Sequence, residues 1–212
     1  MNLGVLALQG DFEAHVRAFE EAGRDGGLEV REVRTAADLD GVDALVIPGG
    51  ESTTMLKLIG MENLTEPLLE FGQRKPIFGT CAGAILLAKE VASPAQWSLG
   101  LMDIAVERNA YGRQVHSDVT RVDLLPGGPS IEAVFIRAPI IRRAGPGVRV
   151  LAVRDGNPIL AAEGLHMAAT FHPELTADRT VQRLFLEHAR RSMQSGARAG
   201  AAQAGAKACG AA

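Results

Sequence analysis

The sequence predicts an α/β fold, in which a mostly parallel, helix-covered central sheet carries antiparallel strands added in the second half of the chain. Two observations support this fold class. In the first half, short apolar runs alternate with segments of helical periodicity. In the second half, strand-like runs follow one another with short connections. Neither a repeat nor a second domain interrupts the pattern, so we expect one domain over residues 1–194.

The alternation starts at the N-terminus. Residues 3–9 (LGVLALQ) form a nearly continuous apolar run, as expected for a strand covered on both faces. Residues 11–23 have apolar side chains at helical spacing and end in glycine, which predicts a helix. Residues 28–34 alternate apolar and charged side chains, as in a half-buried or edge strand. Further strands are expected at 42–50 and 76–80, and helices at 51–60, 63–72 and 82–92.

The second half has a different character. Its strand-like segments are residues 101–108, 118–125, 132–139, 149–164 and 166–171. Asp155–Gly156 divides one of these segments and is a strong turn signal, so we expect a hairpin there. A last helix is predicted over 178–193, with apolar residues and His188 on one face. Residues 195–212 are rich in alanine and glycine without periodicity, and we expect them to form a disordered tail.

The composition excludes several classes of protein. The 212 residues are 47% hydrophobic, enough for a substantial core, and the net charge of −3 lacks the basic excess of a nucleic-acid-binding protein. The apolar runs are far shorter than the roughly 20 residues of a membrane span. The N-terminus lacks the basic segment and cleavage site of a signal peptide. With only Cys81 and Cys209, we expect neither a disulfide framework nor a paired-cysteine metal site, and we predict a cytoplasmic protein.

Cys81 lies in a turn of small residues, GTCAG (79–83), between a predicted strand and a predicted helix. This is the layout of a nucleophile elbow with cysteine in place of serine. The small residues permit a tight turn, and the N-terminus of the following helix favours a thiolate. A small buried core residue is an equally good interpretation of Cys81. This stretch alone does not decide between the two.

A cysteine nucleophile needs a base, and the base needs an orienting group. Of the five histidines, His172 is the best candidate, because it follows a predicted strand and precedes Glu174 by two residues. In extended backbone these two side chains project from the same face and can form a hydrogen bond. Pro173 helps to hold His172 out of the helical region. The alternative is an ordinary surface turn. A metal site is disfavoured, since no other ligand pair has suitable spacing.

A third segment, residues 46–54 (VIPGGESTT), runs from a strand through two glycines into a helix. Its backbone N–H groups can serve as an oxyanion hole. A phosphate-binding loop would need a lysine that is missing here. An ordinary strand–helix connection with Ser52 as N-cap is another interpretation, and it is compatible with an oxyanion hole. In a parallel sheet, this segment and residues 76–81 end at the same carboxyl edge, where open α/β sheets bind ligands.

The strings PGGEST, GTCAGAILLA and FHPEL resemble the class I, triad-type glutamine amidotransferases. The strings LALQGDFEAH, ERNAYGRQV and FIRAP are more particular, and they resemble the glutaminase subunits of pyridoxal 5′-phosphate synthases within that class. The resemblance spans about residues 3–193. It implies a flavodoxin-like fold and hydrolysis of L-glutamine to L-glutamate and ammonia through a cysteine thioester. It also implies delivery of the ammonia to a synthase subunit that makes pyridoxal 5′-phosphate, with no cofactor in the glutaminase itself.

The resemblance further implies a role for each matching residue. The nucleophile is Cys81, the base is His172 and the third triad member is Glu174. The implied glutamine contacts are Gly50, Glu51, Ser52, Arg108, Ile136 and Arg137, and the implied oxyanion donors are the backbone amides of Gly49, Gly50 and Ala82. Arginines suit the α-carboxylate of a free amino acid, although a lone arginine at a strand end is more often simply solvated.

Three other functions remain open on the sequence. Another class I amidotransferase, for example one serving histidine or purine synthesis, would share the triad but supply a different acceptor. A catalytically silent regulatory module would be expected to lose a triad member, and this chain keeps all three. A cysteine peptidase or chaperone-like relative fits the HPE segment and the paired arginines less well.

The segment QGDFEAH (9–15) follows the first predicted strand. We therefore expect it to emerge at the carboxyl edge beside the glycine loop. Our hypothesis is that this segment and the first helix contact the synthase subunit, and that docking completes the oxyanion hole.

Overall fold

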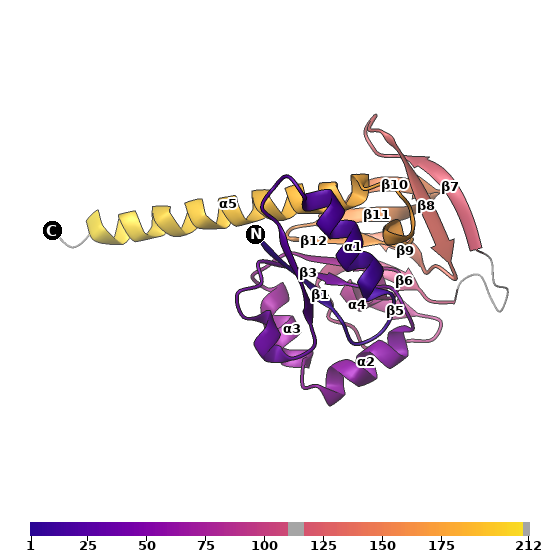
Figure 1. Ribbon diagram of the computed structural model, residues 1–212, viewed down its shortest axis with the longest axis horizontal. Coiled ribbons are helices and arrows are strands. Elements are labelled where there is room, and N and C mark those ends of the chain that lie inside the picture. The colour runs from indigo at the N-terminus through magenta and orange to yellow at the C-terminus, as the bar shows by residue number, and fades with distance from the viewer. Residues whose placement is uncertain (110–116, 210–212) are drawn as a thin grey trace.

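The computed structural model describes residues 1–109 and 117–209 of the chain. At its centre is a seven-stranded sheet (Figure 1). From one edge to the other, its strands are β10 (Arg149–Arg154), β11 (Asn157–Glu163), β12 (His166–Ala169), β4 (Ile77–Thr80), β3 (Ala44–Ile47), β1 (Asn2–Leu6) and β2 (Glu29–Val33). The strands from β12 to β2 run parallel, and β11 and β10 are antiparallel additions. The predicted fold class is confirmed, as is the edge position of β2.

Helices cover both faces of this sheet, because its strands direct alternate side chains into two separate cores. One face carries α1 (Phe12–Gly23) and α5 (Thr180–Cys209). There Phe19, Phe78 and Phe185 pack with ring centroids between 5.3 and 6.5 Å apart. The other face carries α2 (Ser52–Met61), α3 (Thr65–Gly72) and α4 (Ala82–Leu87).

Two smaller sheets are built from the later part of the chain. β5 (Ala88–Ala92) pairs parallel with β6 (Met102–Glu107), and β6 pairs antiparallel with β9 (Ile140–Ala144). β7 (Ser117–Asp123) and β8 (Ser130–Ile136) form an antiparallel pair. Two short 3-10 helices complete the described elements, η1 (Ala36–Leu39) and η2 (Pro173–Leu175). The predicted hairpin at Asp155–Gly156 is confirmed, since it joins β10 to β11 with φ values of 50° and 75°.

The helix predicted over residues 82–92 is wrong in its second half. α4 ends at Leu87, and the chain continues directly as β5. The loop after β5 folds back on this junction, where Leu99 N donates to Leu86 O at 2.8 Å and Ser98 Oγ donates to Ala88 O at 2.6 Å. These groups and the partner strand β6 come from later in the chain, so the local apolar pattern does not reveal them. The same holds for β9, which has no counterpart among the predicted strands.

Helix α5 buries Val181 and Phe185 as predicted. It continues to Cys209 (Figure 1), whereas the composition predicts a disordered tail from residue 195. The difference has a physical reason, since alanine, which makes this segment low in complexity, has the highest helix propensity. The division into a domain of residues 1–194 and a separate tail stays a prediction. Within the described ranges, no helix combines the length and the apolar character needed to cross a membrane.

Candidate active site

Cys81 lies at the sharp turn between β4 and α4, where the elbow layout predicts it. Its backbone has φ 48° and ψ −102°, a conformation that is rare for a residue with a side chain. The flanking glycines make the turn possible. A Cβ on Gly79 would collide with the backbone of Gly83, and a Cβ on Gly83 would collide with the carbonyl oxygen of Ile47. Cys81 N donates to Ala169 O at 2.8 Å, which ties the turn to neighbouring β12.

His172 and Glu174 meet as predicted, but through a different backbone geometry. His172 Nδ1 lies 2.7 Å from Glu174 Oε1. The prediction of extended backbone is wrong, because the chain leaves the sheet after β12 and residues 173–175 form η2, with Pro173 in its first turn. Gln182 of α5 donates to the Pro173 carbonyl at 3.0 Å. Helix α5 therefore holds the turn that carries the carboxylate.

Opposite charges lie side by side in this buried turn. The side chain of Glu174 is 1% exposed and that of His172 is 12% exposed. Burial disfavours the charged imidazole, but hydrogen bonds to Cys81 and Glu174 and the charges of these groups raise the pKa of His172 to about 10. Burial also disfavours the carboxylate, but His15 and His172 lower the pKa of Glu174 to about 2. At neutral pH, an imidazolium therefore lies between the Cys81 side chain and a carboxylate.

The glycine loop after β3 closes a further side of this cluster. A Cβ on Gly49 would collide with His172 Cε1 and would lie 3.3 Å from Cys81 Cβ, so the loop backbone packs against both residues. Gly50 has φ 144°, in the region that favours glycine. The three predicted segments thus meet at the carboxyl edge of the parallel strands. The amides of Gly49, Gly50 and Ala82 remain predicted oxyanion donors.

The loop after β1 emerges beside the glycine loop, which confirms the position predicted for residues 9–15. Gln9 makes two reciprocal hydrogen bonds with the backbone of Glu51. Its Oε1 accepts from Glu51 N at 3.4 Å, and its Nε2 donates to Glu51 O at 3.3 Å. Gly10 lies so close to the Gly49 carbonyl oxygen that a Cβ would not fit. The first loop and the glycine loop are therefore in direct contact.

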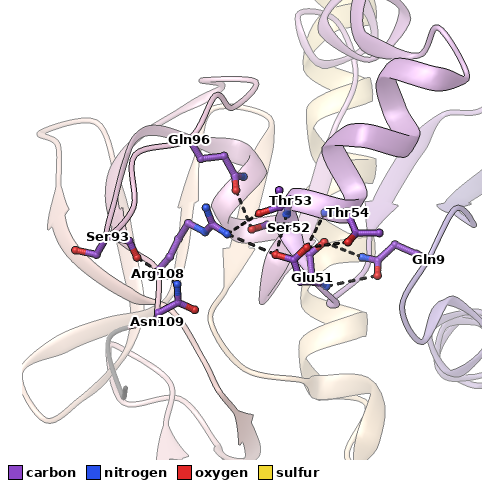
Figure 2. Close-up of polar contacts among 9 residues, drawn as sticks. All are labelled: Gln9, Glu51, Ser52, Thr53, Thr54, Ser93, Gln96, Arg108 and Asn109. Carbon is purple, nitrogen blue, oxygen red and sulfur yellow. Dashed lines mark hydrogen bonds and ion pairs between the residues drawn. The ribbon is translucent and has the colours of Figure 1, made fainter. Parts of the chain in front are cut away.

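A second polar cluster lies at the start of α2, where Gln9 and Arg108 converge on Glu51 from opposite sides (Figure 2). Arg108 extends from the end of β6. Its Nη2 donates to Thr53 Oγ1 at 2.9 Å and lies 3.5 Å from Glu51 Oε1. The guanidinium is largely buried, so these two partners stabilise its charge. Burial disfavours the Glu51 carboxylate, but hydrogen bonds from Thr53 and Thr54 outweigh this effect and lower the pKa of Glu51 to about 2.

The N-cap of α2 is Glu51, so the interpretation with Ser52 as N-cap is wrong. The Glu51 carboxylate accepts from Thr53 N at 3.0 Å and from Thr54 N at 2.7 Å. A charged carboxylate at this position also complements the helix dipole. Ser52 is the first helical residue and is buried, and its Oγ donates to Gln96 Oε1 at 3.1 Å.

Ile136 and Arg137 lie at the end of β8, beside the turn that carries His172. The carbonyl oxygen of Val134 in β8 accepts from His172 N at 2.8 Å. Ile136 is half-buried, and Arg137 is exposed with φ 45°. Their glutamine contacts stay predictions. In the string NAYGRQV, residues 110–115 lie outside the described residues, as does His116 after it.

His15 also lies in this site, although its sequence pattern does not single it out. It is fully buried on α1, with Nε2 3.1 Å from Thr80 Oγ1 and 3.3 Å from Glu174 Oε2. Its spacing from Phe12 and Phe19 places it on the buried face of the helix, but that pattern is also typical of a core histidine. Within the described residues, no group of three or more His, Cys, Asp and Glu side chains could hold a metal ion.

Solved structures share this architecture. A solved glutamine amidotransferase is 46% identical to this chain and has a TM-score of 0.79, covering 88% of this chain and 98% of its own. A glutamine amidotransferase of Thermotoga maritima is 15% identical, with a TM-score of 0.58 over 92% of this chain and 85% of its own, and it shows the fold alone. The fold, the cysteine elbow and the 46% identity to a solved member place this chain in the class of glutamine amidotransferases.

The sequence comparisons identify the family within this class. The sequence profile of the SNO glutamine amidotransferase family matches residues 5–191, and the chain belongs to this family. The pyridoxal 5′-phosphate synthase subunit PdxT of Solibacter usitatus is 54% identical over 190 residues, 87% of this chain and 97% of the relative. The subunit of the same name from Thermotoga neapolitana is 46% identical over 189 residues, 88% of this chain and 98% of the relative.

Proposed function

We propose that this chain is the glutaminase subunit of a pyridoxal 5′-phosphate synthase, which hydrolyses L-glutamine and passes the ammonia to a synthase subunit. The observation that carries the proposal is the contact of three segments at one sheet edge: Cys81 on its elbow, the buried His172–Glu174 pair and the Gly49 backbone packed against them. Family membership and the PdxT relatives support the same reaction and the same pathway.

The first half of the proposed reaction forms a thioester. The Cys81 thiolate attacks the side-chain amide carbon of glutamine, so a C–S bond forms. Backbone amides of Gly49, Gly50 and Ala82 stabilise the tetrahedral oxyanion. The C–N bond then breaks, and the His172 imidazolium gives its proton to the leaving nitrogen, which departs as ammonia. Glu174 holds the imidazole in the orientation that this transfer needs.

The second half hydrolyses the thioester. His172, now neutral, accepts a proton from water, and the water oxygen attacks the thioester carbon. The C–O bond forms, the C–S bond breaks, and Cys81 leaves as a thiolate beside the regenerated imidazolium. The products of the complete cycle are glutamate and ammonia, and the enzyme returns to its starting charge state.

The polar cluster of Figure 2 is the proposed binding half of the site. Arg108 and Arg137 supply positive charge for the α-carboxylate of glutamine, and Glu51 supplies negative charge for its ammonium group. Gly50, Ser52 and Ile136 complete the proposed contacts. Arg108 is already oriented by Thr53 and Glu51, so little side-chain entropy is lost when substrate binds.

The synthase subunit is proposed to dock on residues 9–15 and α1. Docking on this surface can regulate the glutaminase site, because the Gln9 side chain is hydrogen-bonded to the backbone of Glu51, which directly follows the glycine loop. A partner that moves Gln9 would therefore move the proposed oxyanion amides. A cytoplasmic location, which the cysteine content predicts, is part of the same proposal.

Ammonia release from glutamine tests the proposed function. We expect release by the wild-type chain with its synthase subunit, and a loss of at least about 1,000-fold in Cys81→Ala. Cys209→Ala is the matched control and should keep wild-type activity. Retained activity in Cys81→Ala would exclude the thioester at this residue. Full wild-type activity without the synthase subunit would contradict partner-dependent completion of the oxyanion hole.

A further inference from the structure

His15 connects α1 to two parts of the proposed catalytic centre. Its imidazole is completely buried. The Nε2 atom lies 3.1 Å from the hydroxyl of Thr80, the residue before the nucleophile, and 3.3 Å from Glu174 Oε2. The other oxygen of the same carboxylate, Oε1, lies 2.7 Å from His172 Nδ1. Two imidazoles on different elements therefore share one carboxylate.

The chemistry of this contact determines how His15 acts. A carboxylate only accepts hydrogen bonds, so the Nε2 atom that faces Glu174 must carry its hydrogen. This N–H also faces the Thr80 hydroxyl, which accepts in hydrogen-bond geometry. Glu174 Oε2 has no partner in such geometry among the described residues, and a buried charged oxygen without complementary charge is unstable. Of the groups that favour the ionised carboxylate, His15 has the largest effect.

We propose that His15 is a positioning residue for glutamine hydrolysis. It holds the Oε2 atom of Glu174, so that the Oε1 atom stays hydrogen-bonded to His172. The proposal rests on the proposed function, since it needs the Cys81–His172–Glu174 triad to be catalytic. His15 itself does not touch substrate. It acts by fixing the direction of the carboxylate, and through it the imidazole that transfers the proton.

A purely structural histidine would behave differently on substitution. If His15 only fills the core beneath α1 and accepts or donates to Thr80, its loss lowers the free energy of unfolding and leaves the turnover of the folded fraction unchanged. If it positions Glu174, its loss lowers kcat, while the KM for glutamine changes little because no binding residue is disturbed.

The experiment compares His15→Leu and His15→Gln in the complex with the synthase subunit, measuring kcat and KM for glutamine. We expect kcat to fall roughly 10- to 100-fold in His15→Leu with KM within about twofold. His15→Gln places an amide N–H near the position of Nε2, so it should recover most of the lost kcat. The matched control is His166→Gln. His166 is also a buried histidine, but it lies at the end of β12 away from His172, so this variant should keep wild-type kcat.

Three outcomes would overturn the proposal. One is an unchanged kcat in folded His15→Leu, and another is an equal loss of kcat in His15→Leu and His15→Gln. The third is an additive loss of kcat in the double variant that combines His15→Leu with Glu174→Gln. Because His15 is proposed to act through Glu174, the double variant should be no slower than Glu174→Gln alone, and additive losses would contradict this.

Two further measurements keep the test decisive. Urea unfolding of each variant shows whether it is folded, and if His15→Leu is not, His15→Asn replaces it, since its shorter amide does not reach Glu174. A lower kcat in His15→Asn than in His15→Gln supports the proposal, and equal values overturn it. Cys81→Ala separates the two levels of inference. If it stays active, the proposed function fails, whereas an inactive Cys81→Ala with a fully active His15→Leu refutes only the role of His15.

Discussion

Two histidines, one at each end of β12, have pKa values shifted in opposite directions. His166 begins the strand and is buried, and its Nδ1 accepts from Ile77 N at 3.3 Å. Burial, and then the positive charge of His188, lower the pKa of His166 to about 4. His172 lies three residues beyond the strand, and there the opposing contributions of Cys81 and Glu174 overcome burial and raise its pKa to about 10.

Burial by itself does not determine the charge of these two imidazoles. At the amino end of β12, burial has the largest effect on the pKa of His166 and leaves a neutral imidazole that completes backbone hydrogen bonding. At the carboxyl end, the same burial is present, but a carboxylate and a thiol stabilise the cation. The two ends of one short strand therefore differ in the charged partners that the fold brings to them.

Glu174→Gln is expected to have the largest effect, because it removes the charge that distinguishes the two ends. The amide keeps the shape of the carboxylate but no longer stabilises the imidazolium or fixes its orientation. We expect kcat for ammonia release to fall about 100- to 10,000-fold, with a smaller change in KM. Steady-state ammonia release in the complex measures both constants. Glu70→Gln, which removes an exposed carboxylate on α3, serves as control. A kcat within a few-fold of wild type would show that Glu174 does not act on His172.

Arg108→Gln tests the binding half of the site and should have the next largest effect. The substitution removes a buried guanidinium that contacts Thr53 and Glu51. We expect KM for glutamine to rise roughly 10- to 100-fold, since a charge-assisted hydrogen bond is lost, while kcat changes less. Arg74→Gln, at an exposed arginine in the turn after α3, is the control. A fall in kcat at constant KM would instead assign Arg108 to the chemical step.

The pH dependence of turnover examines His172 directly. A group whose pKa is raised in the folded protein stays protonated up to that value, so the acid form of His172 is present at neutral pH and is lost as the pH rises through about 10. We expect kcat to be level near neutrality and then to fall up to about tenfold per pH unit above 10. In Glu174→Gln the fall should begin at lower pH. If the kcat of the wild type instead began to fall near pH 6.5 as the pH rises, this would contradict an imidazolium that is stabilised by Cys81 and Glu174.

His166→Gln should have the smallest effect, and only at acid pH. The native imidazole stays neutral down to about pH 4, while the unfolded chain takes up a proton below about 6.5. The contribution of His166 to stability is thus complete above pH 6.5 and decreases as the pH falls toward 4, by at most about 1.4 kcal/mol per pH unit. Urea unfolding at pH 7 and pH 5 should show a smaller acid loss for His166→Gln than for wild type. Equal losses would mean that His166 does not titrate on unfolding.

The carboxyl end of the sheet could be predicted largely because its information is local. Glycines on both sides of Cys81 indicate an elbow, and His172 and Glu174 are only two residues apart, so their contact follows from several backbone geometries. It survives even though η2 replaces the expected extended chain. The glycine loop meets them because parallel strands end at one edge.

Other features depend on contacts between distant residues, and the sequence could not predict them. The contact between His15 and Glu174 joins positions 159 apart along the chain. α4 gives way to β5 because Ser98, Leu99 and β6 offer hydrogen-bond partners from later segments. Glu51 rather than Ser52 caps α2, since the choice depends on which side chain the loop turns toward the helix and which one Gln96 holds in the interior.

The place of β12 in the sheet has a consequence for synthesis of the protein. β12 lies in the interior of the sheet, between β4 and β11, yet it is the last strand among the described residues. A ribosome delivers Cys81 long before His172 and Glu174, so the partly made chain carries a cysteine without its imidazole. With the proposed roles, glutamine hydrolysis begins only when β12 inserts beside β4. On the same proposed roles, a product that stops before residue 172 would consume no glutamine, and completion of the fold would itself be the step that activates the thiol.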